Sequence, residues 1–266
     1  MNTKSFIKIE KFKKALSKFN SIKPFPYVVV DDFLSLNLAK KIEKNFPNHT
    51  DKKLWSYKNY CEIKKATDNW NMFPPEAYQL LSILNSHDFL ETIKKKIKLK
   101  NLYPDYGLNG GGFHIMGEKG KLNPHLDYII HPKLNLMRKF NLIVFFNLKW
   151  KSINGGELCL YEKNSQNKKL PGKLVKKIEP KFNRAILFDT TQNSWHGLSR
   201  EVKACKDIFR KSIATYYLCD LPDDADRRGK ALFHPTKEQE KDEEVLELIK
   251  KRADILTASH VYKKKK

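Results

Sequence analysis

The stretch N-P-H-L-D-Y (residues 123–128) stands within the part of the chain that alternates apolar and polar residues. His125 and Asp127 are two positions apart, so an extended strand points both side chains to the same face. A second imidazole follows much later, in S-W-H-G (residues 194–197). Two imidazoles and one carboxylate form the facial triad of non-haem Fe(II) sites, which leaves coordination positions open. The sequence therefore predicts a metal site made of His125, Asp127 and His196.

The period of the hydrophobic residues becomes two from Gly110 onward. This period is typical of strands, and we expect eight of them: residues 113–116, 124–130, 138–148, 157–161, 173–178, 185–188, 194–198 and 209–218. The Asn-Gly-Gly run at 154–156 is typical of a hairpin turn. Eight short strands separated by turns predict a sandwich or a closed roll.

Helices are expected before and after this region. Residues 5–19 carry Phe6, Ile9, Phe12 and Leu16 at helical spacing. Other helical patterns cover residues 35–46, 76–85, 88–98 and 238–253, and a β-branched run at 27–30 predicts a short strand. Residues 51–73 are polar and aromatic and predict no element. The helices should buttress the sheet.

The last expected strand carries a further signal. Arg210 and Ser212 share one of its faces, and a guanidinium beside a hydroxyl is suited to binding a carboxylate. Lys211 should point to the opposite face.

These motifs form an ordered set: H-x-D, a Gly-Gly hairpin, Asn183-Arg184 ahead of a strand, S-W-H-G, and R-x-S on a strand. Together they resemble the 2-oxoglutarate/Fe(II)-dependent dioxygenases, in particular the prolyl-4-hydroxylase-like branch, over residues 24–220. The resemblance implies a mainly β fold with flanking helices. Its core would be a double-stranded β-helix (jelly-roll) at about residues 110–220, with the N-terminal helices on one side.

The resemblance also implies the chemistry. Fe(II) would be bound by the triad, and Arg210 would bind the distal carboxylate of 2-oxoglutarate with Ser212 as a second donor. Asn141 and Arg138 are further candidates for contacts with the cosubstrate or the substrate. The enzyme would hydroxylate a C–H bond, coupling O₂ reduction to decarboxylation of 2-oxoglutarate to succinate and CO₂, with ascorbate as reductant. Many prolyl hydroxylases carry Lys in place of Arg210, so the substrate stays open between a prolyl residue in a peptide and a small metabolite.

Alternatives exist at the site and for the function. His131 competes with His125, but it stands in Ile-His-Pro, where a strand should end. The other histidines, His114 among them, have no such context and are expected to be structural or exposed. A non-catalytic jelly-roll binding protein would not need the triad. A nucleic-acid demethylase would suit the basic charge, but it usually carries a second arginine soon after the first, and residues 211–216 contain none.

Composition narrows the class of protein. The 266 residues carry a net charge of +22, which favours nucleic acid or ribosomes as partners, yet the lysines are dispersed and no motif supports this. No signal peptide or apolar run of membrane-spanning length is present, so we expect a cytoplasmic protein. No pattern predicts an oligomeric state.

The chain is expected to have three parts. We divide it into a basic amphipathic helix (1–23), the dioxygenase domain (24–220), and a charged helix with a mobile basic tail ending in Lys263 to Lys266 (221–266).

Overall fold

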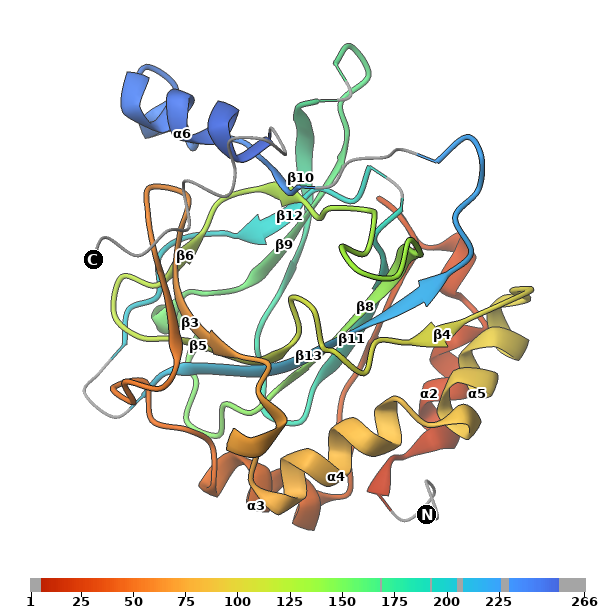
Figure 1. The fold of residues 1–266 in the computed structure, drawn as a ribbon. Coiled ribbons are helices and arrows are strands. Elements are labelled where there is room, and N and C mark those ends of the chain that lie inside the picture. Colours follow the sequence, from red (N-terminus) through yellow and green to blue (C-terminus); the bar gives the residue numbers. More distant parts are fainter. Residues whose placement is uncertain (1–5, 168, 192, 205–207, 226–229, 254–266) are drawn as a thin grey trace.

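The computed structural model describes residues 6–167, 169–191, 193–204, 208–225 and 230–253. Within them, two antiparallel sheets face each other (Figure 1). The larger sheet has the order β1-β11-β8-β13-β5-β3-β2, with β4 beside β13 and β6 beside β3; the smaller has the order β10-β9-β12-β7-β14. The strands of the larger sheet are β1 (Tyr27–Val30), β2 (Trp55–Lys58), β3 (Glu62–Thr67), β4 (Tyr103–Pro104), β5 (Gly112–Met116), β6 (Lys121–Leu122), β8 (Met137–Phe145), β11 (Ala185–Asp189) and β13 (Arg210–Cys219). Those of the smaller sheet are β7 (His125–Leu126), β9 (Leu158–Lys163), β10 (Pro171–Ile178), β12 (His196–Leu198) and β14 (Leu232–Phe233).

Four helices lie against the larger sheet, on the side away from the smaller one (Figure 1). They are α2 (Ile9–Leu16), α3 (Leu36–Lys44), α4 (Pro75–Leu84) and α5 (His87–Ile97). Their apolar faces are buried in one core with the sheet. The ring of Phe12 stacks on that of Phe89 with centroids 5.4 Å apart, and Phe89 also contacts Tyr217 of β13. The expected buttress of helices is therefore present.

The predicted double-stranded β-helix class is confirmed by these two antiparallel sheets, and each of the eight expected strands is present. One is much shorter than expected. Instead of covering residues 124–130, the strand ends at Leu126, and residues 127–129 belong to neither sheet. Ile130 then forms only an isolated bridge with Met137 of the larger sheet.

Residues 51–73, for which no element was expected, contain the hairpin β2–β3 and the 3₁₀ turn Trp70–Met72. The N-terminal helix is shorter than residues 5–19: α2 ends at Leu16 and a separate 3₁₀ turn covers Phe19–Ser21.

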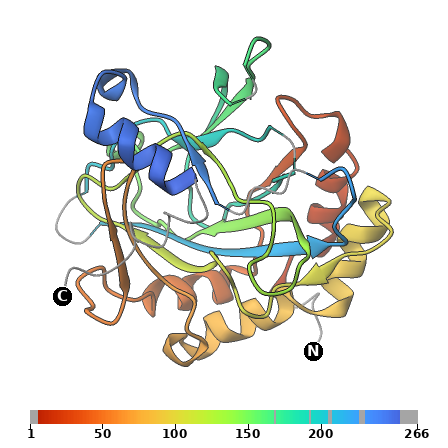
Figure 2. The same ribbon diagram turned by 45° about the horizontal axis from the view of Figure 1, so that its top comes forward.

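The C-terminal segment joins the smaller sheet. After β14, a 3₁₀ turn at Lys237–Gln239 leads into α6 (Glu243–Ala253), whose start is later than the predicted residue 238. Figures 1 and 2 show the tip of the β2–β3 hairpin reaching α6. None of the described helices has the length and apolar character needed to cross a membrane. The predicted tail, Lys263 to Lys266, lies outside the described residues.

Candidate metal and cosubstrate site

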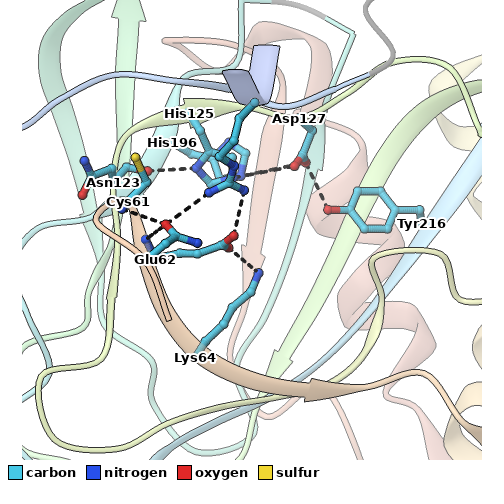
Figure 3. A network of polar contacts seen from close by, with 10 residues as sticks. Cys61, Glu62, Lys64, Asn123, His125, Asp127, His196 and Tyr216 are labelled. Carbon is cyan, nitrogen blue, oxygen red and sulfur yellow. Dashed lines mark hydrogen bonds and ion pairs between the residues drawn. The ribbon is translucent and has the colours of Figure 1, made fainter. Parts of the chain in front are cut away.

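The three predicted metal ligands meet between the two sheets. His125 of β7 lies directly opposite His196 of β12 in the register, and their rings are 4.3 Å apart. Asp127 completes the group: its Oδ1 is 3.7 Å from Nε2 of His125 and its Oδ2 is 3.9 Å from Nε2 of His196. All three side chains are buried, and their ligand atoms lie within 4.8 Å of one another (Figure 3). This donor set suits a non-haem Fe(II) ion.

The backbone fixes the orientation of both imidazoles. Nδ1 of His125 lies 3.0 Å from the carbonyl oxygen of Asn123, and Nδ1 of His196 lies 2.8 Å from that of Ser194. A carbonyl oxygen only accepts, so each Nδ1 carries a hydrogen, and each Nε2 faces Asp127. Burial and the neighbouring His196 lower the pKa of His125 to about 3, which keeps this imidazole neutral. His125 is thus in the form that binds a metal, and Nδ1 of both histidines is engaged by the backbone.

The carboxylate of Asp127 is fixed by a hydrogen bond from Tyr216, whose ring stacks with Arg138. Burial alone would raise its pKa, but the charges of His196 and Arg138 outweigh burial and lower it to about 2. The hydroxyl of Tyr216 donates to Oδ2 of Asp127 over 3.1 Å. Cζ of Arg138 lies 3.3 Å from the centroid of the Tyr216 ring and 3.8 Å from that of Tyr128. Asp127 is therefore an anion in a fixed position.

A cavity of about 440 Å³ adjoins the three side chains. Its wall on the larger sheet follows from strand register: Ser212 of β13 lies opposite His114 of β5, and Tyr216 lies opposite Asn141 of β8. Arg210, two positions before Ser212, points to the same face of β13, toward the cavity. Lys211 turns to the other side, where its Nζ is 2.9 Å from Glu43 of α3. The predicted alternation of this strand is therefore correct.

Arg210 has the properties of an anion-binding group. Its side chain is buried, and its Nε donates to the carbonyl oxygen of Gly156 over 2.8 Å. Burial lowers the pKa of Arg210 to about 10, so the guanidinium remains charged at neutral pH. Within the described residues it has no carboxylate at ion-pair distance. Glu157 lies near enough to raise the pKa of Arg210 but not to form an ion pair with it, so a carboxylate ligand fits this position.

Asn141 also lines the cavity and is buried. Its Oδ1 has no hydrogen-bond partner among the described residues. Since the amide oxygen and nitrogen can be exchanged by a flip, this side chain can offer an acceptor or a donor to a ligand.

Two residues considered from the sequence lie elsewhere. Nδ1 of His131 accepts from the backbone of Lys133, and its Nε2 lies 3.5 Å from Asp105, so His131 is not part of the three-residue group. Nη2 of Arg184 lies 2.9 Å from Oδ2 of Asp31, and Arg184 does not line the cavity.

Several residues of the cavity have no clear signal in the sequence. His114, expected to be structural or exposed, faces the cavity, and burial lowers its pKa to about 3. The alternation of β5 allows His114 to face the cavity. The sequence alone does not show which face of this short strand lines the cavity, because that depends on its pairing with Ser212 of β13. Other lining side chains with no expected role come from the β2–β3 hairpin and the C-terminal segment: Trp55, Tyr57, Glu62, Lys64, Phe233 and Arg252.

One part of the chain matches a known protein family. Residues 111–219 match the model of the 2OG-Fe(II) oxygenase superfamily. This part of the chain is a 2OG-Fe(II) oxygenase domain. The matched range includes both predicted histidines, Asp127 and Arg210, and the predicted 2-oxoglutarate/Fe(II)-dependent oxygenase is confirmed at this level. Compared with curated proteins by sequence, the chain finds no significant match.

Solved structures of the same fold include three prolyl hydroxylases. The Trichoplax adhaerens enzyme, solved with a hypoxia inducible factor peptide, is 17% identical with a TM-score of 0.54; the alignment covers 79% of this chain and 90% of that one. The Pseudomonas putida prolyl-4-hydroxylase is 12% identical with a TM-score of 0.56, covering 79% and 99%. The Phytophthora capsici prolyl 4-hydroxylase is 19% identical with a TM-score of 0.55, covering 88% and 70%. This likeness is one of fold, and it agrees with the predicted prolyl-4-hydroxylase-like branch.

Proposed function

We propose that His125, Asp127 and His196 bind Fe(II) in this oxygenase domain. The observation that carries the proposal is the convergence of three buried donor atoms within 4.8 Å, with both Nδ1 atoms engaged by backbone carbonyls. Bound there, Fe(II) would supply the redox chemistry that activates O₂. The role of the chain is to keep Asp127 anionic and His125 neutral, and to orient all three ligands before the metal arrives.

We propose further that Arg210 binds the distal carboxylate of 2-oxoglutarate. Its buried guanidinium, which forms no ion pair with a carboxylate of the described residues, supports this, as does the hydroxyl of Ser212 on the same face of β13. Asn141, with its unpartnered Oδ1, lies on the neighbouring strand and is the third candidate for this contact. The guanidinium offers a bidentate contact, which fixes the orientation of the cosubstrate.

The reaction we propose is hydroxylation of a C–H bond, coupled to conversion of 2-oxoglutarate to succinate and CO₂. An extended peptide is the substrate class that the surface favours. The cavity shares Trp55, Tyr57 and Asp68 with an adjoining hollow of about 600 Å³ along the β2–β3 hairpin, so a groove continues away from the triad. The Trichoplax adhaerens relative in fold was solved with a peptide. A small metabolite is the second candidate, because a relative in fold, HygX from Streptomyces hygroscopicus, was solved with hygromycin B (10% identity, TM-score 0.52, 77% and 86% covered).

The test is succinate release with Fe(II), 2-oxoglutarate and ascorbate across pools of proline-containing peptides and of metabolites. His125→Ala, Asp127→Ala and His196→Ala should each abolish turnover and weaken binding of Ni(II), used as a redox-inert probe in calorimetry, because a three-ligand site does not keep its geometry after losing one ligand. The matched control is His131→Ala, which should bind Ni(II) like the wild-type chain. Wild-type turnover in any of the three variants would remove that residue from the site.

A further inference from the structure

We infer that the C-terminal segment, residues 232–252, is a positioning element for the metal ligand His125. The inference rests on the proposed metal site and adds a part of the chain beyond residues 111–219, where the family model matches. Three contacts carry it: one to the face of the imidazole, one to the backbone that orients it, and one that secures the segment itself.

The first contact is a ring stack. Strand β14 pairs with β7 so that Phe233 lies directly opposite His125. The two rings are nearly parallel, at 14°, with centroids 5.0 Å apart, and Phe233 is buried. The ring of His196 lies 4.3 Å from the same imidazole. His125 is therefore confined between Phe233 and His196, which restricts rotation of its ring about χ2.

The second contact reaches the peptide that orients the imidazole. The carbonyl of Asn123 accepts the hydrogen bond from Nδ1 of His125. The side chain of Asn123 in turn donates to Oε1 of Gln239 over 2.7 Å and to the carbonyl of His234 over 3.1 Å. The backbone N–H of His234 donates to the carbonyl of Pro124 over 2.8 Å. The C-terminal segment thus fixes the two residues that precede His125.

The third contact secures the segment to the β2–β3 hairpin. Cζ of Arg252, on α6, lies 4.0 Å from the centroid of the Phe233 ring. Its Nη2 is 2.7 Å from Oε1 of Glu62, and both side chains are buried (Figure 3 shows Glu62 beside the triad). Lys64 lies 3.3 Å from the other oxygen of Glu62. A buried ion pair is costly to break from one side, so this pair holds the guanidinium over Phe233.

The second histidine is supported differently. His196 is oriented by the carbonyl of Ser194, and its ring contacts Phe188 of β11 at 4.8 Å. Both residues lie within the matched family region. Disrupting the C-terminal segment should therefore disturb one ligand and leave the other in place, giving weakened metal binding rather than complete loss.

The experiment uses the full chain without oxygen, with Co(II) as the metal probe. Phe233→Leu keeps the apolar volume but removes the stacked ring; Phe233→Tyr keeps the ring. We expect Phe233→Leu to raise the Co(II) dissociation constant by about 10- to 100-fold, the usual effect of removing a group that orients a ligand, and to change the visible absorption of the bound Co(II). Phe233→Tyr should restore both. Leu246→Ala, at an exposed position of α6, is the matched control.

A second variant leaves the apolar core untouched. Gln239→Ala removes the hydrogen bond to Asn123, and Glu238→Ala beside it is its control. We expect Gln239→Ala to weaken Co(II) binding in the same direction as Phe233→Leu, with the thermal unfolding temperature of the metal-free chain recorded alongside. Wild-type Co(II) affinity and absorption in both Phe233→Leu and Gln239→Ala, even with a lower unfolding temperature, would overturn the inference. A wild-type chain that binds no Co(II) would overturn the proposed metal site, and this inference with it.

Discussion

The Nδ1 atoms of His125 and His196 decide what these side chains can do. Each lies against the carbonyl of the residue two positions earlier in the chain, at 3.0 and 2.8 Å. A local hydrogen bond of this kind needs no partner from elsewhere in the fold, so the tautomer is set within the motif itself. The convergence of the two Nε2 atoms, in contrast, depends on the pairing of β7 with β12.

Substitutions of Arg210 should change the affinity for 2-oxoglutarate. Replacing a buried guanidinium that binds a carboxylate by alanine leaves the carboxylate unpaired, which costs about 2–5 kcal/mol. We therefore expect Arg210→Ala to raise the KM for 2-oxoglutarate by roughly 30- to several-thousand-fold. Arg210→Lys should recover part of this affinity, since it restores charge without the planar fork. Steady-state succinate release against 2-oxoglutarate concentration measures both.

Two neighbours on the same strand serve as comparisons. Ser212→Ala removes only a neutral donor to a charged group, so a smaller penalty of about 1–3 kcal/mol is expected. Lys211→Ala removes a charge from the opposite face of β13 and should leave the KM for 2-oxoglutarate unchanged. If Arg210→Ala weakened Ni(II) binding without changing that KM, the cosubstrate would have to be held by another cation, with Arg138 the next candidate.

His114 predicts a pH dependence of stability. Its pKa falls from 6.5 to about 3 in the folded chain, chiefly through burial. Below pH 6.5 the unfolded imidazole takes up a proton while the folded one does not, so stability falls as the pH falls from about 6.5 toward 3. The limit is about 1.4 kcal/mol per pH unit, and the partial exposure of His114 to the cavity reduces it. His114→Gln should lessen this slope in urea unfolding between pH 7 and 4.5; equal slopes would contradict the assignment.

At the scale of elements, the strands of the oxygenase domain could be predicted because their two faces differ. On β13 the apolar and polar positions separate clearly, and Lys211 reaches Glu43 on the helix side while Arg210 and Ser212 face the cavity. The same alternation placed His125 and Asp127 on one face, although the strand ends between them. The predicted pair is nevertheless correct, because Oδ1 of Asp127 lies 3.7 Å from Nε2 of His125.

Other elements could not be predicted because their stability comes from distant partners. Strand β2 is at the edge of the larger sheet and has mostly exposed residues, so its sequence shows no alternation. Strand β14 has two residues and exists through its pairing with β7. The buried ion pair of Arg252 and Glu62 joins residues 190 positions apart, so no local sequence pattern predicts it.

Removing a buried ring from the helices that pack against the larger sheet should lower the stability of the fold strongly. Phe89 of α5 is fully buried, stacks on Phe12 and contacts Phe33 edge-on. Phe89→Ala should lower the free energy of unfolding by about 3–5 kcal/mol, the transfer and cavity cost of removing a buried ring. Leu36→Ala, at an exposed position of α3, should change it by less than about 0.5 kcal/mol. A decrease below about 1 kcal/mol for Phe89→Ala in denaturant unfolding would show that α5 is not part of the cooperative core.

At the scale of the whole molecule, the cavity is assembled from segments far apart in the sequence. Lys64 comes from the β2–β3 hairpin, His125 and Arg210 from the matched domain, and Phe233 from the C-terminal segment. The family model ends before the last of these. The oxygenase domain therefore supplies the side chains proposed to bind metal and cosubstrate, and the flanking segments supply the rest of the wall.

The net charge of +22 gives a prediction at the same scale, and the basic end of the chain is the place to test it. If the charge is solvated surface, removal of Lys263 to Lys266 should leave turnover unchanged at physiological salt, where exposed charges are screened beyond about 8 Å. The measurement is succinate release by the full and shortened chains at two salt concentrations. Binding of a single-stranded oligonucleotide, followed against salt, accompanies it, because each phosphate contact adds to the slope. A shortened chain that loses activity, or whose oligonucleotide affinity falls with a shallower salt slope, would show that these lysines recognise an anionic partner.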